Sequence, residues 1–399
     1  MDIIILILAL ILLSYIMSGR AFRIRRPTLA IHLTYGAEFA LVGVLLGPYV
    51  LNILTPDLID QLEPLINICL GWIGLMFGFQ LRLKDLKLLP LSNYFIAGIE
   101  TGTTFVIMLI AFLGVKDMFG ATIGYPQAGT ALAFMLAAIA IISSPSIITA
   151  VIKRSHAHGR VSRTLQYISS FDNVFGLLAF GLIYPFFHYS IKVGEGALPG
   201  WAWLIISLGA GVALGALFHC FIAPRANSNQ NLIIAVGMVT FSTGIAYDLH
   251  LSALVTNVAV GAVLCNYSER YDRFYRLLVH AERPLYVILL IMAGALWRMS
   301  PLIAALSVIF IVVRVVGKSV GGIAAFKRYP NIIENPGLFG SALLAQGGMA
   351  LAIAIDYRFL MPGETSSVLI GLVLTTLALN GLISPHTIKY LLKREGEIA

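Results

Sequence analysis

Long apolar runs, separated by short polar stretches, follow one another along almost the whole 399-residue chain. A helix needs about 20 apolar residues to cross the roughly 30 Å hydrocarbon core of a bilayer, because each residue adds about 1.5 Å. By this measure the pattern predicts an all-α integral membrane protein with 13 transmembrane helices and no soluble domain. The predicted helices are 2–17, 28–53, 62–80, 91–114, 127–152, 160–189, 200–222, 229–247, 251–267, 281–297, 300–324, 335–357 and 364–391.

Two of these segments carry polar interruptions. The fifth contains Ser143-Ser144-Pro145-Ser146, in which proline lacks a backbone N–H and so frees a carbonyl group. The twelfth contains Ala345-Gln346-Gly347-Gly348. Matching Pro and Gly interruptions in two halves of a transporter indicate an ion site, because freed carbonyls and half-helix ends can hold a cation. We therefore expect discontinuous helices at both places; a kink needed only for packing is the alternative.

Composition supports the membrane interpretation. Hydrophobic residues make up 59% of the chain and charged residues 12%, with a mean hydropathy of +0.90, whereas soluble domains carry about 25% charged residues. The apolar start predicts a retained first helix rather than a secretory signal, because Asp2 precedes it and arginines from Arg20 onward follow it. Cys69, Cys220 and Cys265 show neither a disulfide framework nor a metal spacing, and we interpret them as small packing residues.

The basic residues indicate the orientation of the chain. The net charge is +8, and most of the 27 lysines and arginines fall in alternate loops between the predicted helices. The other loops carry only Lys116, Lys192, Arg298 and Arg358. Because cytoplasmic loops are enriched in Lys and Arg, we predict an N-terminus outside and a C-terminus in the cytoplasm, in the plasma (inner) membrane of a prokaryote. This topology explains the basic balance without a nucleic-acid partner.

A faint internal repeat accompanies the helices. The motif Gly43–Tyr49 recurs as Gly261–Tyr267, at an offset of 218 residues, and Met76–Gly78 recurs as Met292–Gly294, at an offset of 216. Under the predicted topology the second helix runs outward and the ninth runs inward. Corresponding helices of opposite direction predict inverted repeats, which are common in secondary transporters. Chance similarity of apolar strings is the alternative.

Five charged residues fall deep within the predicted helices: Glu38, Glu100, Asp172, Arg314 and Lys318. Such groups are costly in hydrocarbon unless they are paired or face water, so each is a candidate functional residue. Arg314 keeps its charge and needs a carboxylate or water, for which Asp172 and Glu100 are the candidate partners; a stabilising ion pair is the alternative role. Lys318 can extend to the inner interface. Glu38 either faces a solvated cavity or bonds to a neighbouring helix.

Asp172 lies near the middle of the sixth predicted helix, at a depth similar to that of the break in the fifth. A titratable carboxylate beside carbonyl and hydroxyl oxygens can bind either a proton or a small hard cation such as Na⁺. Either occupant neutralises the site. This competition is the physical basis of antiport.

The chain resembles the membrane domain of the monovalent cation/proton antiporter superfamily, of the sodium/hydrogen exchanger type, over essentially its full length. The motifs that carry the resemblance are Gly43–Pro48, Ser143–Pro145, Asp172–Gly176, Arg314–Lys318 and Gln346–Gly348. The resemblance implies an elevator-type secondary transporter, a homodimer in the lipid bilayer, that exchanges Na⁺ or K⁺ for protons without a resident cofactor. It also implies a core from about 91–189 and 300–391, with crossed discontinuous helices 5 and 12, and a dimer or scaffold part from about 1–60 and 200–267.

The resemblance also assigns roles to particular residues. The ion- and proton-binding residues it implies are Ser143, Ser144, Asp172 and Asn173, of which Asp172 and Asn173 are the expected cation ligands. The expected supporting network combines Arg314, Lys318 and Gln346, which lie in these motifs, with Glu100 and Glu38, which are candidates because of their depth in the predicted helices. Arg314 matches the position where the family keeps Arg or Lys, and Arg there favours electroneutral, one-for-one exchange.

One position departs from the family pattern. Family members carry Asp-Asp or Asn-Asp in helix 6, and the second residue is the ion-binding acid, whereas this chain has Asp172 followed by Asn173. One residue rotates a side chain by about 100° around a helix. The favoured interpretation is that Asp172 has taken over the proton-carrying role. The alternatives are a non-transporting sensor with an Asp172–Arg314 ion pair, and a carrier of another solute. No nucleotide loop, zinc spacing or nucleophilic arrangement in the sequence indicates an enzyme.

Overall fold

The computed structural model describes residues 37–87, 90–117, 126–187, 199–221, 228–267, 271–361 and 363–398, and these form helices and connecting loops without a strand. The predicted first helix, 2–17, lies outside the described residues. Six described stretches are long and apolar enough to cross a membrane: Leu91–Gly114, Gly129–Arg154, Arg160–Phe187, Gly200–Cys220, Pro301–Phe326 and Glu364–Arg394. The all-α membrane architecture is therefore confirmed, and the count of thirteen crossings stays a prediction.

The described helices pack as two groups. The first group consists of α3 (Ala37–Leu46), α4 (Pro56–Gln61), α5 (Glu63–Phe79), α12 (Gly200–Phe221), α13 (Ser228–Asp248), α14 (Ala253–Tyr267) and α15 (Tyr271–Ala295). The second group consists of α7 (Leu91–Gly114), α9 (Pro126–Ala140), α10 (Pro145–Arg154), α11 (Arg160–Ile183), α16 (Pro301–Phe326), α17 (Pro336–Ala342), α18 (Gly348–Leu360) and α19 (Glu364–Arg394). The short helices α6 (Leu83–Lys87) and η2 (Tyr184–Phe187) lie where the chain passes between the groups.

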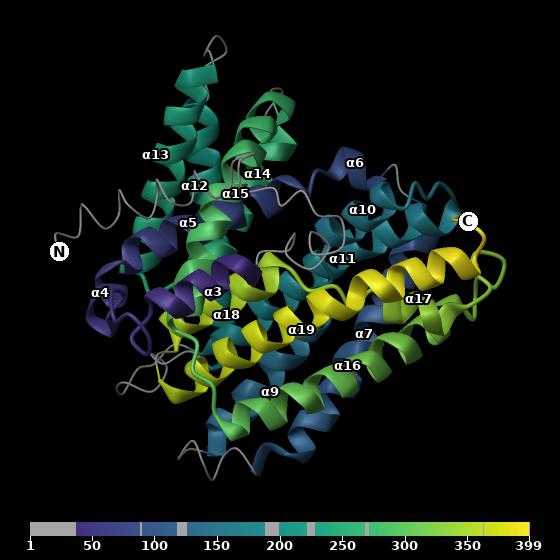
Figure 1. Ribbon diagram of the computed structural model, residues 1–399. Helices are drawn as coiled ribbons and strands as arrows, with labels where there is room; N and C mark the ends of the chain where they lie inside the picture. Colours follow the sequence, from purple (N-terminus) through teal and green to yellow (C-terminus); the bar gives the residue numbers. More distant parts are fainter. Residues whose placement is uncertain are drawn as a thin grey trace.

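Figure 1 shows the first group at the left and top of the view and the second group at the right and bottom. Contacts are dense within each group, above all between α5 and α14 and between α7 and α16. Contacts between the groups are fewer, and α18 makes several of them, against α5, α14 and α15. The second group contains Asp172 on α11 and Arg314 on α16, so it holds the residues of interest.

Glycines at two helix contacts support the internal repeat. A Cβ atom on Gly43 of α3 would lie 2.9 Å from the Cα of Gly294 on α15. A Cβ atom on Gly78 of α5 would lie 2.8 Å from the Cα of Gly261 on α14. Gly43 and Gly261 come from the two copies of one motif, and Gly78 and Gly294 from the two copies of the other. The repeat therefore uses equivalent residues to bring two equivalent pairs of helices together.

Serine and proline begin the half-helix α10. The hydroxyl of Ser144 accepts a hydrogen bond from the backbone N–H of Ile147, and Pro145 is the first helical residue. Proline fits this position because the first-turn N–H groups have no intrahelical acceptor. The polar stretch predicted to interrupt the fifth segment is therefore the start signal of a new helix. At the second predicted interruption, α17 ends at Ala342 and α18 begins at Gly348.

Two carboxylates near the C-terminus bind the starts of second-group helices. Glu397 accepts hydrogen bonds from the backbone N–H groups of Val161, at 2.6 Å, and Ser162, at 2.9 Å, and it also contacts the Ser162 hydroxyl. Helix α11 has no side-chain cap of its own at Gly159, so Glu397 takes that role. Glu395 accepts from the backbone N–H of Asn335, directly before α17, at 2.9 Å.

We expect Glu397→Ala to lower the melting temperature of the detergent-solubilised protein. The substitution removes the acceptor for two amides at a positive helix end, which costs about 1–2 kcal/mol. Glu334→Ala serves as the control, because the carboxylate of Glu334 lies at an exposed position and caps no helix in the described part of the chain. Equal melting temperatures for Glu397→Ala and wild type would contradict this role.

Candidate functional site

The two helix interruptions meet inside the second group. The backbone N–H of Ser144 donates to the carbonyl oxygen of Ala345 at 2.8 Å. The hydroxyl of Ser143 contacts the carbonyl oxygen of Leu343 at 2.7 Å. Two non-helical stretches, about 200 residues apart in sequence, therefore supply hydrogen-bond partners for each other's backbone groups where no water is available.

Arg314 holds the interruptions together. Its guanidinium is fully buried and donates to the carbonyl oxygens of Ala140 at 2.8 Å, Ile142 at 2.6 Å and Leu344 at 2.5 Å. These carbonyls lie at or just beyond the C-terminal ends of α9 and α17, where the helix dipoles are negative and intrahelical donors are lacking. The planar fork of five N–H donors suits such a cluster of acceptors. The predicted pairing of Arg314 with Asp172 or Glu100 is wrong, because carbonyl oxygens take its donors.

Lys318 is the cation that faces the carboxylates. Its ammonium group lies 2.8 Å from Asp172 Oδ2, 3.1 Å from Glu100 Oε2 and 2.9 Å from the carbonyl oxygen of Ile141. These three acceptors match the three donors of an ammonium group. The expectation that Lys318 extends to the inner interface is wrong, because its side chain is fully buried. Hydrogen bonds to Glu100 on α7 and Asp172 on α11 compensate the charge of Lys318 inside the protein, so its side chain has no need to reach the membrane surface.

Asp172 has one occupied oxygen and one unoccupied oxygen. Its Oδ2 contacts both the Ser143 hydroxyl and Lys318, whereas its Oδ1 is buried and has no hydrogen-bond partner among the described residues. The side-chain oxygen of Asn173 is also buried and unpartnered there. Buried polar atoms normally have partners, so these two oxygens are candidates for binding an ion. They are hard ligands of the type that alkali cations prefer.

The remaining predicted residues occupy different places. Ser144 caps α10, and Gln346 accepts a hydrogen bond from the amide of Asn380 on α19 at 2.8 Å. Glu38 lies in the first turn of α3, in the first group, and so outside the group of helices that holds Asp172. Sequence reasoning missed Asn380, and also Thr104, whose hydroxyl donates to Glu100 at 3.2 Å. Thr104 follows Glu100 by four residues on α7, a spacing that could have indicated the contact.

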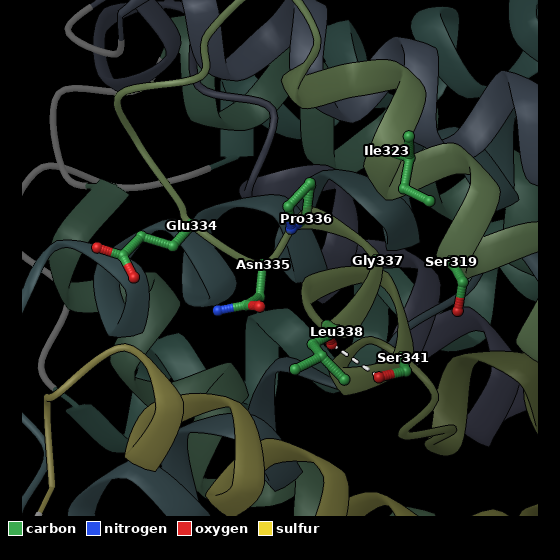
Figure 2. Close-up of a pocket in the computed structure, with 8 residues that line it drawn as sticks. All are labelled: Ser319, Ile323, Glu334, Asn335, Pro336, Gly337, Leu338 and Ser341. Carbon is green, nitrogen blue, oxygen red and sulfur yellow. Dashed lines mark hydrogen bonds between the residues drawn. The ribbon is translucent and has the colours of Figure 1, made fainter.

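A surface pocket of about 500 Å³ lies beside this network but does not include its charged residues. Figure 2 shows its lining, from Ser319 and Ile323 on α16 to Glu334 and Ser341 around α17. The Ser341 hydroxyl donates to the backbone carbonyl of Leu338 and is thus satisfied within α17. The candidate ion site is therefore the buried contact of the two interruptions, and not this pocket.

The described residues contain no group of three or more His, Cys, Asp or Glu placed to hold a metal ion. The site instead combines one carboxylate with amide, hydroxyl and carbonyl oxygens. A family model described as sodium/hydrogen exchanger, transmembrane, matches residues 8–390 of the chain. The chain belongs to the sodium/hydrogen exchanger family. As a member of that family it is an integral membrane transporter.

Solved structures share the fold of this exchanger. It is similar to the sodium proton antiporter MjNhaP1 from Methanocaldococcus jannaschii at pH 8, with 17% sequence identity, coverage of 98% of both chains and a TM-score of 0.68. A second structure of the same antiporter, a three-dimensional electron-microscopy map, gives 16% identity, coverage of 100% of both chains and a TM-score of 0.68. A search of curated proteins found no match.

Proposed function

We propose that this exchanger swaps Na⁺, or alternatively K⁺, for protons at Asp172 by elevator-type alternating access. The observation that carries the proposal is the buried Asp172 carboxylate, which has one oxygen held by Ser143 and Lys318 and one oxygen without a partner. An acid with a free oxygen beside interrupted helices can accept either a proton or a cation. Membership of a sodium/hydrogen exchanger family supports Na⁺ and protons as the exchanged ions.

Ser143 is suited to both occupants. Its hydroxyl has a single hydrogen but contacts two acceptors, Asp172 Oδ2 and the carbonyl oxygen of Leu343. A protonated Asp172 can donate to the hydroxyl oxygen while the hydroxyl donates to Leu343. With an ionised Asp172, the hydroxyl hydrogen can serve the carboxylate, and the carbonyl of Leu343 then keeps only its longer contact of 3.5 Å with Arg314, so that it can also face a cation. A rotation of the Ser143 O–H bond thus adapts this residue to either occupant.

The arrangement around Lys318 favours electroneutral exchange. When a cation occupies Asp172, Lys318 keeps Glu100 and the Ile141 carbonyl as acceptors, so its positive charge stays compensated. One cation then replaces one proton. The sequence indicates electroneutral exchange because the family position holds Arg314. The structural argument uses Lys318 instead, because Arg314 binds carbonyl oxygens.

Electroneutral exchange makes the rate independent of membrane potential. Movement of one net charge would add about 2.3 kcal/mol of driving force per 100 mV. In proteoliposomes with Na⁺ as the transported cation, we expect the initial rate to stay within about twofold when a K⁺ diffusion potential of either sign is imposed. A steep dependence of the rate on potential would contradict one-for-one exchange.

We further propose that the second group of helices is the mobile core and the first group the scaffold and dimer part. The denser packing within each group than between them supports this division. The proposal includes crossing of the α9–α10 and α17–α18 pairs at their interruptions, thirteen membrane crossings, and a homodimer in a prokaryotic plasma membrane. It also includes an external N-terminus and a cytoplasmic C-terminus, for which the basic loops are the support.

The test is proton flux in proteoliposomes that hold a pH gradient. Addition of Na⁺ or K⁺ to the wild-type protein should release protons from the acidic side, read with a pH-sensitive dye, and choline should not. The Asn173 amide favours one rival function, a sensor with a silenced antiporter fold. No cation-triggered flux in wild type, together with flux in Asn173→Asp, would point to a silenced antiporter fold and overturn the proposed exchange.

A further inference from the structure

A buried carboxylate that takes no part in the ion site connects the two helix groups. Asp356 lies on α18 near its C-terminal end and is almost completely buried. Its carboxylate accepts a hydrogen bond from the Ser252 hydroxyl and faces the backbone N–H groups of Ala253 and Leu254. Ser252 directly precedes α14, and Ala253 and Leu254 are its first two residues, so these groups lie at the start of a first-group helix.

The contact between Asp356 and Ser252 lies at the N-terminal end of α14. The Ser252 hydroxyl also accepts from the backbone N–H of Val255 at 2.9 Å, so serine caps α14 while Asp356 completes the cap from the other group. The positive end of the α14 dipole attracts the carboxylate. No lysine or arginine pairs with Asp356 among the described residues. Its charge therefore depends on donors that belong to the opposite group of helices.

A second contact between the groups lies close by. Arg358, two residues further along α18, lies 3.2 Å from Asp60 on α4. The side chains are 23% and 67% exposed, so water and salt screen this pair and it adds little to the association. The buried contact of Asp356 is thus the stronger of the two. The exposed pair offers a matched control.

We propose that Asp356 and the first turn of α14 form an outer latch, which holds the core against the scaffold in one transport state and opens in the other. The inference rests on the proposed alternating access. Under the predicted topology, α18 ends at the outer side of the membrane. The latch lies next to His250, an exposed residue of the loop before α14, so water can replace the donors once the groups separate. Asp356 is in this sense a positioning residue.

The first experiment measures whether the latch opens. Ser252→Cys, in a protein whose cysteines at 69, 220 and 265 are replaced by serine or alanine, keeps Asp356 and places a thiol in the contact. We expect a membrane-impermeant maleimide, added outside, to label this thiol at least about tenfold faster during Na⁺-driven turnover than in a choline medium, because the contact excludes reagent while closed. Absence of labelling in every medium would overturn the latch, whether or not the protein moves ions.

The second experiment locks the latch. In Ser252→Cys/Asp356→Cys, a short reversible bis-thiosulfonate should cross-link the two thiols and abolish exchange, and a reductant should restore it. An undiminished rate in the cross-linked protein would overturn the proposal, whereas a wild-type protein without any flux would refute the proposed function instead. Asp60→Asn should exchange at a rate within about twofold of wild type, because the pair that it breaks is exposed. If the reduced double variant is inactive, the labelling result decides.

Discussion

Asp172→Asn is expected to abolish cation-triggered proton flux while the protein stays folded. The amide has nearly the shape of the carboxylate but carries no titratable proton and no charge, so the exchange rate should fall by about 100-fold or more. The fold should survive, because Lys318 retains Glu100 and the Ile141 carbonyl as acceptors. The measurement is the initial rate of proton release on addition of Na⁺, with the melting temperature in detergent recorded for each protein.

A nearby serine supplies the control for this variant. The hydroxyl of Ser170, also on α11, donates to the backbone carbonyl of Gln166 within its own helix, and the described part of the chain shows no hydrogen bond between Ser170 and Asp172. Ser170→Ala should therefore exchange at a rate within about twofold of wild type, since substitutions outside the hydrogen-bond network of the ion site have small effects. Full activity of Asp172→Asn would contradict the role of Asp172 and direct attention to Glu100 as the titrating acid.

Local chemistry made the helix interruptions predictable. Proline and glycine disfavour a continuous helix wherever they occur, so Pro145 and the glycines at 347 and 348 predict breaks from their identity alone. The structure begins half-helices at Pro145 and Gly348. The same applies to Ser143 and Asp172, which stand at similar predicted depth and are in contact. Depth along two neighbouring helices is enough to bring such residues together.

The pairing of the charges was not predictable from depth alone. Arg314 and Lys318 lie one helical turn apart on α16, and depth does not tell which of them faces a carboxylate. The repeat carried the missing signal. Glu100 and Lys318 are separated by 218 residues, which equals the offset between the Gly43 and Gly261 motifs, whereas Glu100 and Arg314 are separated by 214. A stricter use of the first offset would have paired Glu100 with Lys318.

Other contacts depend on backbone atoms that the sequence does not display. Arg314 binds carbonyl oxygens whose availability arises only once two half-helices end side by side. Asp356 was not singled out, because it lies at the end of a predicted helix, where a charged residue ordinarily faces water. Its burial follows from the packing of α18 on α14, a contact between residues about 100 positions apart.

Arg314→Met is expected to destabilise the protein more than any change at the ion ligands. Methionine fills part of the space but leaves the carbonyls of Ala140, Ile142 and Leu344 without their donor. Each unsatisfied buried acceptor costs about 1–3 kcal/mol, and removal of the buried charge recovers part of that, so the loss should be on the order of 3–5 kcal/mol. The measurement is the melting temperature in detergent.

The comparison with Arg314→Lys separates two explanations for that loss. If Arg314 acted by its charge toward Asp172, lysine would restore stability fully, because the charge is the same. If it acts by its planar fork on several carbonyls at once, an ammonium group with three donors and a shorter reach restores only part. We expect the partial recovery. Arg358→Met, at the exposed pair with Asp60, should leave the melting temperature nearly unchanged, and wild-type stability in Arg314→Met would show that the two interruptions hold together without the guanidinium.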